Sequence, residues 1–277
     1  MEWSFKNKVI VVTGAGGVLC SEFSRHYAKL GAKVALINRS VEKIELLEKE
    51  LTQEGYIAKA YQCDVLDQER LKEVHQEINK DFGLIDILVN GAGGNMDAAN
   101  TGNEYHEKKI DPSVRDFFKL DSTAISNVFT LNFMGTLLPT QEFASDMCDK
   151  EGCSILNVSS MSSYNPLTKV LGYSAAKAAV NNLTQWLSVH FSHMGIRVNA
   201  VAPGFFVTKQ NKNLLFDSEG NYSARSQKIL AGTPMGKFGV PEDLLGTITY
   251  LVDYNASAFV TGVIIPVDGG FSAYSGV

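Results

Sequence analysis

The chain has 277 residues, of which 45% are hydrophobic and 20% are charged, and its formal net charge is −5. A mildly acidic chain without a long basic run excludes an electrostatic footprint for nucleic acid. The absence of 18 consecutive apolar residues excludes a membrane span, and the four-residue apolar run near the N-terminus is too short for a signal peptide. We therefore expect a globular, cytoplasmic protein that binds neither nucleic acid nor a membrane.

Short β-branched runs that end in glycine or polar residues alternate with helical runs along the sequence. The expected strands cover residues 8–14, 33–39, 58–65, 85–93, 154–158, 195–204 and 260–270. The expected helices cover residues 15–31, 41–55, 68–83, 122–147, 175–190 and 241–253. This alternation predicts a single α/β domain over residues 1–277, with a Rossmann-type, doubly wound parallel sheet.

Two stretches depart from the alternation. Residues 95–116 are polar and irregular, and we expect them to form an insertion over the edge of a cleft. Residues 205–238 mix charged and apolar side chains without a clear period, as a substrate lid does. We expect residues 1–150 to form the cofactor-binding half.

Ligands of such sheets bind beyond the carboxyl ends of the strands, which all lie at one edge. The expected strand ends are Thr13-Gly14, Asn38-Arg39, Asp64-Val65, Asn90-Gly91 and Ser159-Ser160. The first of them opens a glycine-rich turn with Gly14, Gly16 and Gly17, followed by Val18 and Leu19 at the start of a helix. Glycine lets a backbone approach a pyrophosphate, and a helix N-terminus favours the anion. The turn matches GxGxxG imperfectly, because Leu19 replaces the third glycine, and a purely structural turn is the alternative.

The end of the second strand predicts which nucleotide binds. Asn38 and Arg39 stand there, with Lys43 one turn later, and a carboxylate that would bind a ribose 2′-hydroxyl is missing. An arginine at this place favours NADP(H), although NAD(H) stays open and Arg39 could be a solvated surface residue.

Other strand ends add candidate contacts with the cofactor. Asp64, with Val65 beside it, could accept a hydrogen bond from an adenine amino group or cap the next turn. The backbone of Asn90, Ala92 and Gly93 lies in a stretch with little side-chain bulk and can pass close to the cofactor.

Tyr173 and Lys177 stand four residues apart on an expected helix and therefore share a face. A neighbouring ammonium is expected to lower the pKa of a phenol, which could then exchange a proton with a carbonyl or carbinol oxygen. Ser160, preferred over Ser159, can hydrogen-bond the same oxygen. An ordinary exposed helix pair is the alternative reading of Tyr-x-x-x-Lys. Asn132, inside an apolar helix, needs a hydrogen-bond partner.

The cysteines and histidines indicate neither a metal site nor a redox site. The cysteines lie far apart without CxxC spacing, and the histidines do not stand at ligand spacing beside them. We expect reduced thiols and no metal. The cysteines are Cys20, Cys63, Cys148 and Cys153.

These motifs, in this order and spacing, resemble the short-chain dehydrogenase/reductase family over nearly the whole sequence. The resemblance implies that Tyr173 is the acid/base, that Lys177 tunes it and holds the cofactor ribose, that Ser160 positions the substrate oxygen, and that Asn132 supports a proton relay. It also implies a homotetramer and a cofactor carboxamide site. By this resemblance, that site would be made by Pro203, Gly204, the Phe206 backbone and Thr208. Val18 and Cys20 depart from the family by replacing the later glycines of its turn.

A narrower resemblance is to the D-mannonate oxidoreductases (fructuronate reductases) within this family. It rests on TGAGGVLC, NGAGGN, LNFMGTLLPTQ, APGFFVTKQN, TPMGKFG and VDGGFSAYSGV. It implies reduction of a keto sugar acid, D-fructuronate, to D-mannonate. Candidates for binding the substrate carboxylate are Asn95, Lys169, Gln210, Asn211 and Arg225. The alternatives are another enzyme of the family, such as a gluconate or polyol dehydrogenase or a ketoacyl reductase, and a non-enzymatic nucleotide-sensing regulator.

Overall fold

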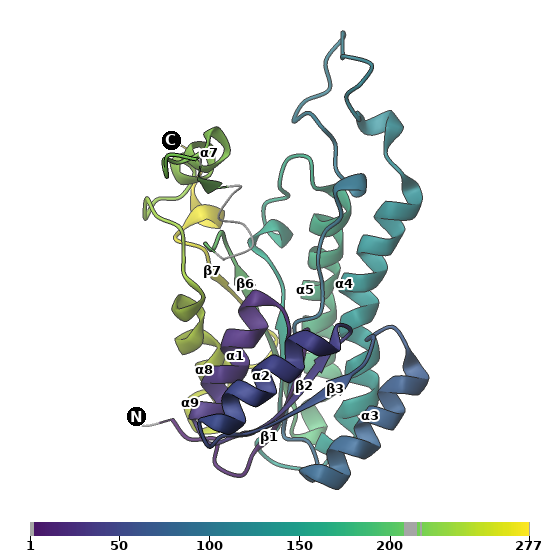
Figure 1. Ribbon diagram of the computed structural model, residues 1–277, viewed down its shortest axis with the longest axis vertical. Helices are drawn as coiled ribbons and strands as arrows, with labels where there is room; N and C mark the ends of the chain where they lie inside the picture. The colour runs from purple at the N-terminus through teal and green to yellow at the C-terminus, as the bar shows by residue number, and fades with distance from the viewer. Residues whose placement is uncertain (1–2, 208–214, 217, 277) are drawn as a thin grey trace.

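The computed structural model describes residues 3–207, 215–216 and 218–276. Within them, seven parallel strands form one sheet in the order β3-β2-β1-β4-β5-β6-β7 (Figure 1). The strands are β1 (Val9–Thr13), β2 (Lys33–Asn38), β3 (Ile57–Gln62), β4 (Ile87–Asn90), β5 (Ser154–Val158), β6 (Arg197–Pro203) and β7 (Ile264–Val267). The strand order reverses between β1 and β4, which is where such sheets bind ligands. The sheet confirms the predicted Rossmann-type, doubly wound α/β fold.

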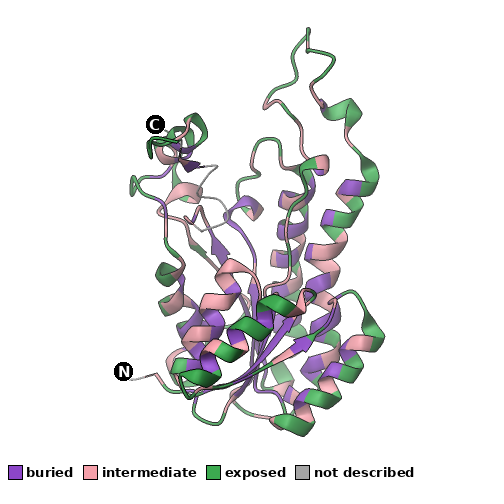
Figure 2. Cartoon of the chain, viewed as in Figure 1, coloured by how far each residue is buried: buried purple, intermediate pink, exposed green. Residues whose placement is uncertain are grey.

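Helices cover both faces of the sheet (Figure 1). They are α1 (Val18–Lys29), α2 (Val41–Gln53), α3 (Gln68–Asp81), α4 (Ser122–Phe143), α5 (Leu171–His190), α7 (Ala224–Ala231), α8 (Leu245–Val252) and α9 (Tyr254–Ser257). One apolar core packs α1, α2 and α8 on the sheet, and a second core packs α3, α4 and α5 on it. Burial on both faces explains why the inner strands β1, β2, β4, β5 and β6 are buried runs, whereas the edge strand β3 alternates buried and exposed residues (Figure 2).

Local signals place most helix ends where the sequence predicts them. α1 is followed by Gly31 at φ 91°, a left-handed conformation that suits glycine. α4 begins after Asp121, whose carboxylate accepts a hydrogen bond from the Thr123 backbone nitrogen. Residues 241–253 differ from the prediction of one helix, because a 3₁₀ turn (Pro241–Leu244) precedes α8.

The two irregular stretches lie beyond the carboxyl edge of the sheet. Residues 97–121 rise above that edge beside the start of α4, and α7 lies across from them (Figure 1). An ion pair between Glu104 and Lys228 joins the two stretches. Of the expected lid, residues 208–214 and 217 lie outside the described residues.

The structure also bears on membrane-spanning helices, metal-ion clusters and the state of the cysteines. No helix in the described part of the protein is long and apolar enough to cross a membrane. Residues 3–207, 215–216 and 218–276 also contain no cluster of His, Cys, Asp and Glu suited to a metal ion. The four cysteines are free thiols, and Cys148 alone among them is exposed.

A buried carboxylate fixes the amino end of the sheet. Asp86, 5% exposed, accepts hydrogen bonds from the Val9 backbone nitrogen at 2.9 Å and from Lys8 Nζ at 3.0 Å, and Lys150 Nζ lies 2.9 Å away. Burial alone would raise the pKa of Asp86, but the bonds from Val9, Lys150 and Lys8 outweigh it and hold the pKa below its ordinary value. The charged form therefore stabilises the fold.

We predict that Asp86→Asn lowers the free energy of unfolding by about 1–3 kcal/mol at pH 7. A lowered folded pKa gives stability that is present above the unfolded pKa, about 3.9, and is lost as the pH falls through the folded pKa. The difference between variant and wild type should therefore shrink below about pH 4, as measured by urea unfolding. Glu69→Gln, which removes an exposed ion pair with Lys72, is the control and should cost much less. Equal losses in the two variants would contradict this account.

Candidate active site

The glycine turn after β1 is shaped by contacts that only glycine permits. Gly14 has φ 68°, and a Cβ there would lie 2.9 Å from the backbone of Ala92, in the turn after β4. A Cβ on Gly16 would lie 2.9 Å from Asn38 Nδ2. Gly17 is the N-cap of α1 and has no side-chain cap. The uncapped helix N-terminus and the bare backbone together suit a pyrophosphate.

Thr13 joins the two glycine-bearing turns. Its Oγ1 accepts hydrogen bonds from the Gly91 and Ala92 nitrogens, at 3.1 and 3.3 Å. The neighbouring Asn90 side chain turns into the core instead, where Nδ2 donates to Thr140 Oγ1 at 2.9 Å and to Asn157 Oδ1 at 3.0 Å. Of Asn90, only the backbone is therefore left to contact a cofactor.

The ends of β2 and β3 meet through a loose ion pair. Arg39 Nη1 lies 3.8 Å from Asp64 Oδ2, and the Arg39 side chain is 81% exposed. Asp64 Oδ1 also accepts from the Leu66 nitrogen at 3.0 Å, so the carboxylate does stabilise the next turn. The Asn38 amide donates to the Ser40 carbonyl. Val65 is buried against α4, where a Cβ on Gly135 would lie 3.0 Å from its side chain.

The ammonium group of Lys177 is buried and lies against the last residue of β5. Lys177 is 4% exposed, and its Nζ donates to the Val158 carbonyl oxygen at 2.7 Å. Its Nζ also lies 5.6 Å from the centre of the Tyr173 ring, so the two predicted residues do meet. Burial disfavours the charged form and lowers the pKa of Lys177 to about 8.

Tyr173 behaves differently from the sequence expectation. Burial raises the pKa of its phenol above the ordinary value near 10, and a hydrogen bond with Ser160 lowers it only in part. The expectation that Lys177 lowers this pKa is therefore wrong in this structure. The physical reason is that the Lys177 ammonium is directed at the Val158 carbonyl, while the phenol lies in a poorly solvated place.

Asn132 finds the partner that its position in an apolar helix requires. Its Nδ2 donates to the Gly94 carbonyl at 2.7 Å, and its Oδ1 accepts from the Gly94 nitrogen at 3.2 Å. A Cβ on Gly93 would lie 2.6 Å from Asn132 Oδ1 and 3.4 Å from Lys177 Nζ. The turn after β4, α4 and α5 therefore converge at Gly93.

The two serines after β5 have different surroundings. Ser159 Oγ donates to Asn181 Oδ1, and Asn181 Nδ2 donates to Ser163 Oγ at 2.8 Å, which ties the segment to α5. Ser160 is the one of the pair that acts on Tyr173, whose pKa it lowers in part. Sequence reasoning preferred Ser160 but missed Asn181 and Ser163, although the serine-rich run from 159 to 163 was a visible signal.

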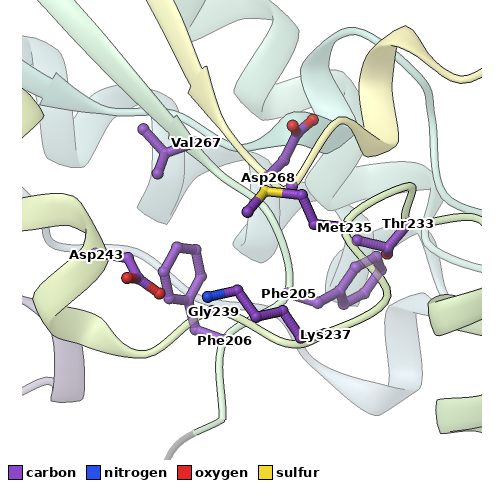
Figure 3. A pocket seen from close by; sticks show the side chains of 10 residues that line it. Phe205, Phe206, Thr233, Met235, Lys237, Gly239, Asp243, Val267 and Asp268 are labelled. Carbon is purple, nitrogen blue, oxygen red and sulfur yellow. The ribbon is translucent and has the colours of Figure 1, made fainter.

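The expected carboxamide site lies where β6 and β7 end. A Cβ on Gly204 would lie 2.6 Å from Asp268 Cα, so the two strand ends are in contact. Figure 3 shows the Phe206 ring in a pocket beside Gly239 and Asp243. The side chain of Phe206 thus packs in this pocket, and its backbone forms a parallel bridge with Gly239. Thr208, Gln210 and Asn211 lie outside the described residues.

The remaining candidates for a substrate carboxylate are spread over three segments. Asn95 Nδ2 donates to Asn100 Oδ1. Arg225 is exposed on α7. Lys169 is exposed with φ 72°, unusual for a residue other than glycine, and its carbonyl accepts from the Thr101 nitrogen. The structure therefore gives each of the three its own surroundings and does not single out a carboxylate site.

Gly93 offers a test of the convergence of β4, α4 and α5. We predict that Gly93→Ala weakens the binding of a nicotinamide dinucleotide at least tenfold, because the methyl group displaces Asn132 or Lys177; tenfold is about 1.4 kcal/mol. Gly94→Ala is the control, since a Cβ there meets nothing within 4 Å. Calorimetry would measure the affinity, and thermal melting would report on the fold. Equal weakening in both variants would contradict the argument.

Comparison with known proteins agrees with this geometry. Residues 8–218 match the family model described as short chain dehydrogenase. The sequence is 49% identical to the uncharacterized oxidoreductase UxuB of Bacillus subtilis, covering 98% of this protein and 96% of that one. It is 30% identical to a 2-dehydro-3-deoxy-D-gluconate 5-dehydrogenase of Pseudoalteromonas atlantica, covering 98% of each.

A solved structure extends the match to three dimensions. It is a provisionally named D-mannonate oxidoreductase of Haemophilus influenzae with bound NAD, 53% identical, with a TM-score of 0.97 over 99% of this protein and 98% of that one. The resemblance therefore holds in sequence, in fold and in the arrangement of the strand ends. The protein belongs to the short-chain dehydrogenase/reductase family, the NAD(P)-dependent oxidoreductases that act on CH–OH groups.

Proposed function

We propose that this oxidoreductase interconverts D-mannonate and D-fructuronate, with Tyr173 as the acid/base. The observation that carries the chemistry is the contact of Tyr173 with both Ser160 and Lys177 at the carboxyl edge of the sheet. The choice of substrate is supported by the provisional name of the Haemophilus structure. The relative that acts on 2-dehydro-3-deoxy-D-gluconate supports sugar acids as a class.

The residues present fit a nicotinamide dinucleotide. At Gly14 and Gly16 a Cβ would collide with neighbouring backbone or side chain, so the protein keeps a bare backbone beside the uncapped N-terminus of α1. We infer that this turn holds the pyrophosphate and that the turn at Ala92 and Gly93 lines the same groove. When bound, the cofactor would supply or accept the hydride.

The protein's own groups would handle the proton. Because burial keeps the pKa of Tyr173 high, the phenol is protonated at neutral pH and can donate to a carbonyl oxygen during reduction. The Ser160 hydroxyl would hydrogen-bond the same oxygen. Oxidation needs the phenolate, so the rate of oxidation should rise as the pH rises toward the raised pKa of Tyr173. Residues 205–238 would cover the substrate as a lid.

Tyr173→Phe tests the acid/base role. We predict a fall in kcat of about 10³-fold for D-mannonate oxidation, followed by cofactor absorbance, because the phenyl ring cannot carry the proton. Cofactor affinity should change little. Tyr164→Phe is the matched control, since Tyr164 OH donates to the Ile264 carbonyl and the variant should keep most activity. Substantial turnover by Tyr173→Phe would contradict the acid/base role of Tyr173. If the wild-type protein oxidises gluconate or a polyol faster than D-mannonate, that compound is the better substrate and the D-mannonate proposal fails.

We also propose NAD(H) as the preferred cofactor, which revises the expectation drawn from Arg39. Arg39 already has a carboxylate partner in Asp64, and that carboxylate would repel a 2′-phosphate placed between them. The NAD in the Haemophilus structure supports the same choice.

Calorimetry with NAD and NADP in parallel tests this preference. Wild type should bind NAD more tightly. Asp64→Asn removes the repelling charge and frees Arg39, so it should improve NADP binding by up to about fivefold, of the order expected for one exposed charge. In Arg39→Ala, NAD affinity should hold while any NADP affinity falls. Tighter binding of NADP by wild type would restore the original expectation and overturn the proposal.

A further inference from the structure

Ser162 makes two contacts with the hydroxyl oxygen of Ser160. Its backbone nitrogen donates to Ser160 Oγ at 3.2 Å, and its own Oγ donates to the same atom at 3.1 Å. The two residues stand at the start of a 3₁₀ turn, Met161–Ser163, that follows β5. Ser162 is 1% exposed and Ser160 is 8% exposed, so water competes little for these bonds.

These two contacts determine the direction of the Ser160 hydroxyl proton. A serine oxygen accepts through two lone pairs and donates one proton. With both acceptor positions filled by Ser162, the Ser160 proton has to point away from Ser162. The Ser160 hydroxyl also acts on Tyr173, whose pKa it partly lowers, so we infer that the open side of Ser160 faces the phenol.

We propose that Ser162 is a positioning residue that orients the Ser160 hydroxyl, so that its proton is directed at the Tyr173 oxygen and at the substrate oxygen beside it. The inference rests on the acid/base function proposed for Tyr173. Ser162 itself would touch neither substrate nor cofactor, and it would act only through Ser160.

The neighbouring serine shows that the role is specific to Ser162. Ser163 stands in the same turn, but its Oγ donates to the backbone carbonyl of Ser160 and accepts from Asn181 Nδ2. Ser163 therefore holds the backbone of the segment rather than the Ser160 hydroxyl. Its removal should loosen the turn without turning that hydroxyl.

The site also allows a conservative variant. Ser162 borders a surface cavity of about 400 Å³, lined in part by Pro166, Val170 and Ser174. The methyl group of threonine can occupy that space while its hydroxyl keeps the bond to Ser160. Ser162→Thr should therefore restore what Ser162→Ala loses.

The test compares Ser162→Ala, Ser162→Thr and Ser163→Ala in the full-length protein. The first measurement is the ¹³Cζ resonance of Tyr173 in tyrosine-labelled protein, assigned by its absence in Tyr173→Phe. We expect it to shift in Ser162→Ala, where the Ser160 proton is no longer directed, and to stay near the wild-type position in the other two variants.

The second measurement is the pH profile of D-mannonate oxidation. Loss of the Ser160 bond should raise the pH midpoint of kcat and lower kcat about tenfold at neutral pH, the effect of one hydrogen bond of roughly 1.4 kcal/mol. KM should change less than about threefold, because the lost interaction acts on the rate rather than on substrate binding. Ser162→Thr should recover the midpoint, and Ser163→Ala should not move it even if it lowers the melting temperature.

The outcomes separate this inference from the proposed function. A Ser162→Ala protein with an unchanged Tyr173 resonance and an unchanged midpoint would overturn the positioning role. If Ser162→Ala does not fold, Ser162→Gly takes its place, since it also removes the hydroxyl: a shifted resonance supports the role and an unchanged one refutes it. If wild type does not oxidise D-mannonate at all, the substrate proposal fails, while the Tyr173 resonance still decides the role of Ser162.

Discussion

The buried ammonium of Lys177 restricts how the elements around the site can be placed. It is directed at a neutral carbonyl, Val158 O, and its pKa falls to about 8 because the carbonyl only partly replaces lost hydration. A charge held this way needs its acceptor at a fixed distance, so the end of β5 cannot drift relative to α5. A Cβ on Gly93 would lie 3.4 Å from Nζ and 2.6 Å from Asn132 Oδ1, so the glycine turn has no room for a side chain there. The end of β5, α5 and the glycine turn thus meet beside Lys177, and Asn132 closes the turn from α4.

That fixed distance is maintained by hydrogen bonds inside the core rather than at the site. Asn157 on β5 accepts from Asn90 on β4 and donates to Thr184 on α5 at 2.9 Å. Asn90 also donates to Thr140 on α4. These amides and hydroxyls join two strands and two helices, and buried polar networks of this kind favour one arrangement over alternatives. α4 carries Asn132 and α5 carries Tyr173 and Lys177, so this network in the core fixes the spacing of these three side chains.

The sequence predicts most of the frame because strand and helix periods are local properties. Their alternation predicted the parallel sheet, and parallel strands necessarily bring Thr13, Asn90 and Ser160 to one edge. The partner of Asn132 was required by burial, yet its identity as Gly94 depends on how the turn after β4 packs on α4. The pairing of Arg39 with Asp64 depends on rotamers of exposed side chains. Neither contact can be obtained from spacing.

The pKa of Tyr173 shows where reasoning from spacing fails. Four residues on a helix place an ammonium near a phenol, but the sign of the shift depends on depth and direction. At this depth burial acts on both groups and disfavours each charged form, so it raises the pKa of Tyr173 and lowers that of Lys177. With the ammonium directed elsewhere, Ser160 is the side chain that lowers the pKa of Tyr173 and so favours the phenolate. The proton affinity of Tyr173 then depends on how one hydroxyl is oriented, and the residues that orient it belong to a short turn rather than to the helix that carries the tyrosine.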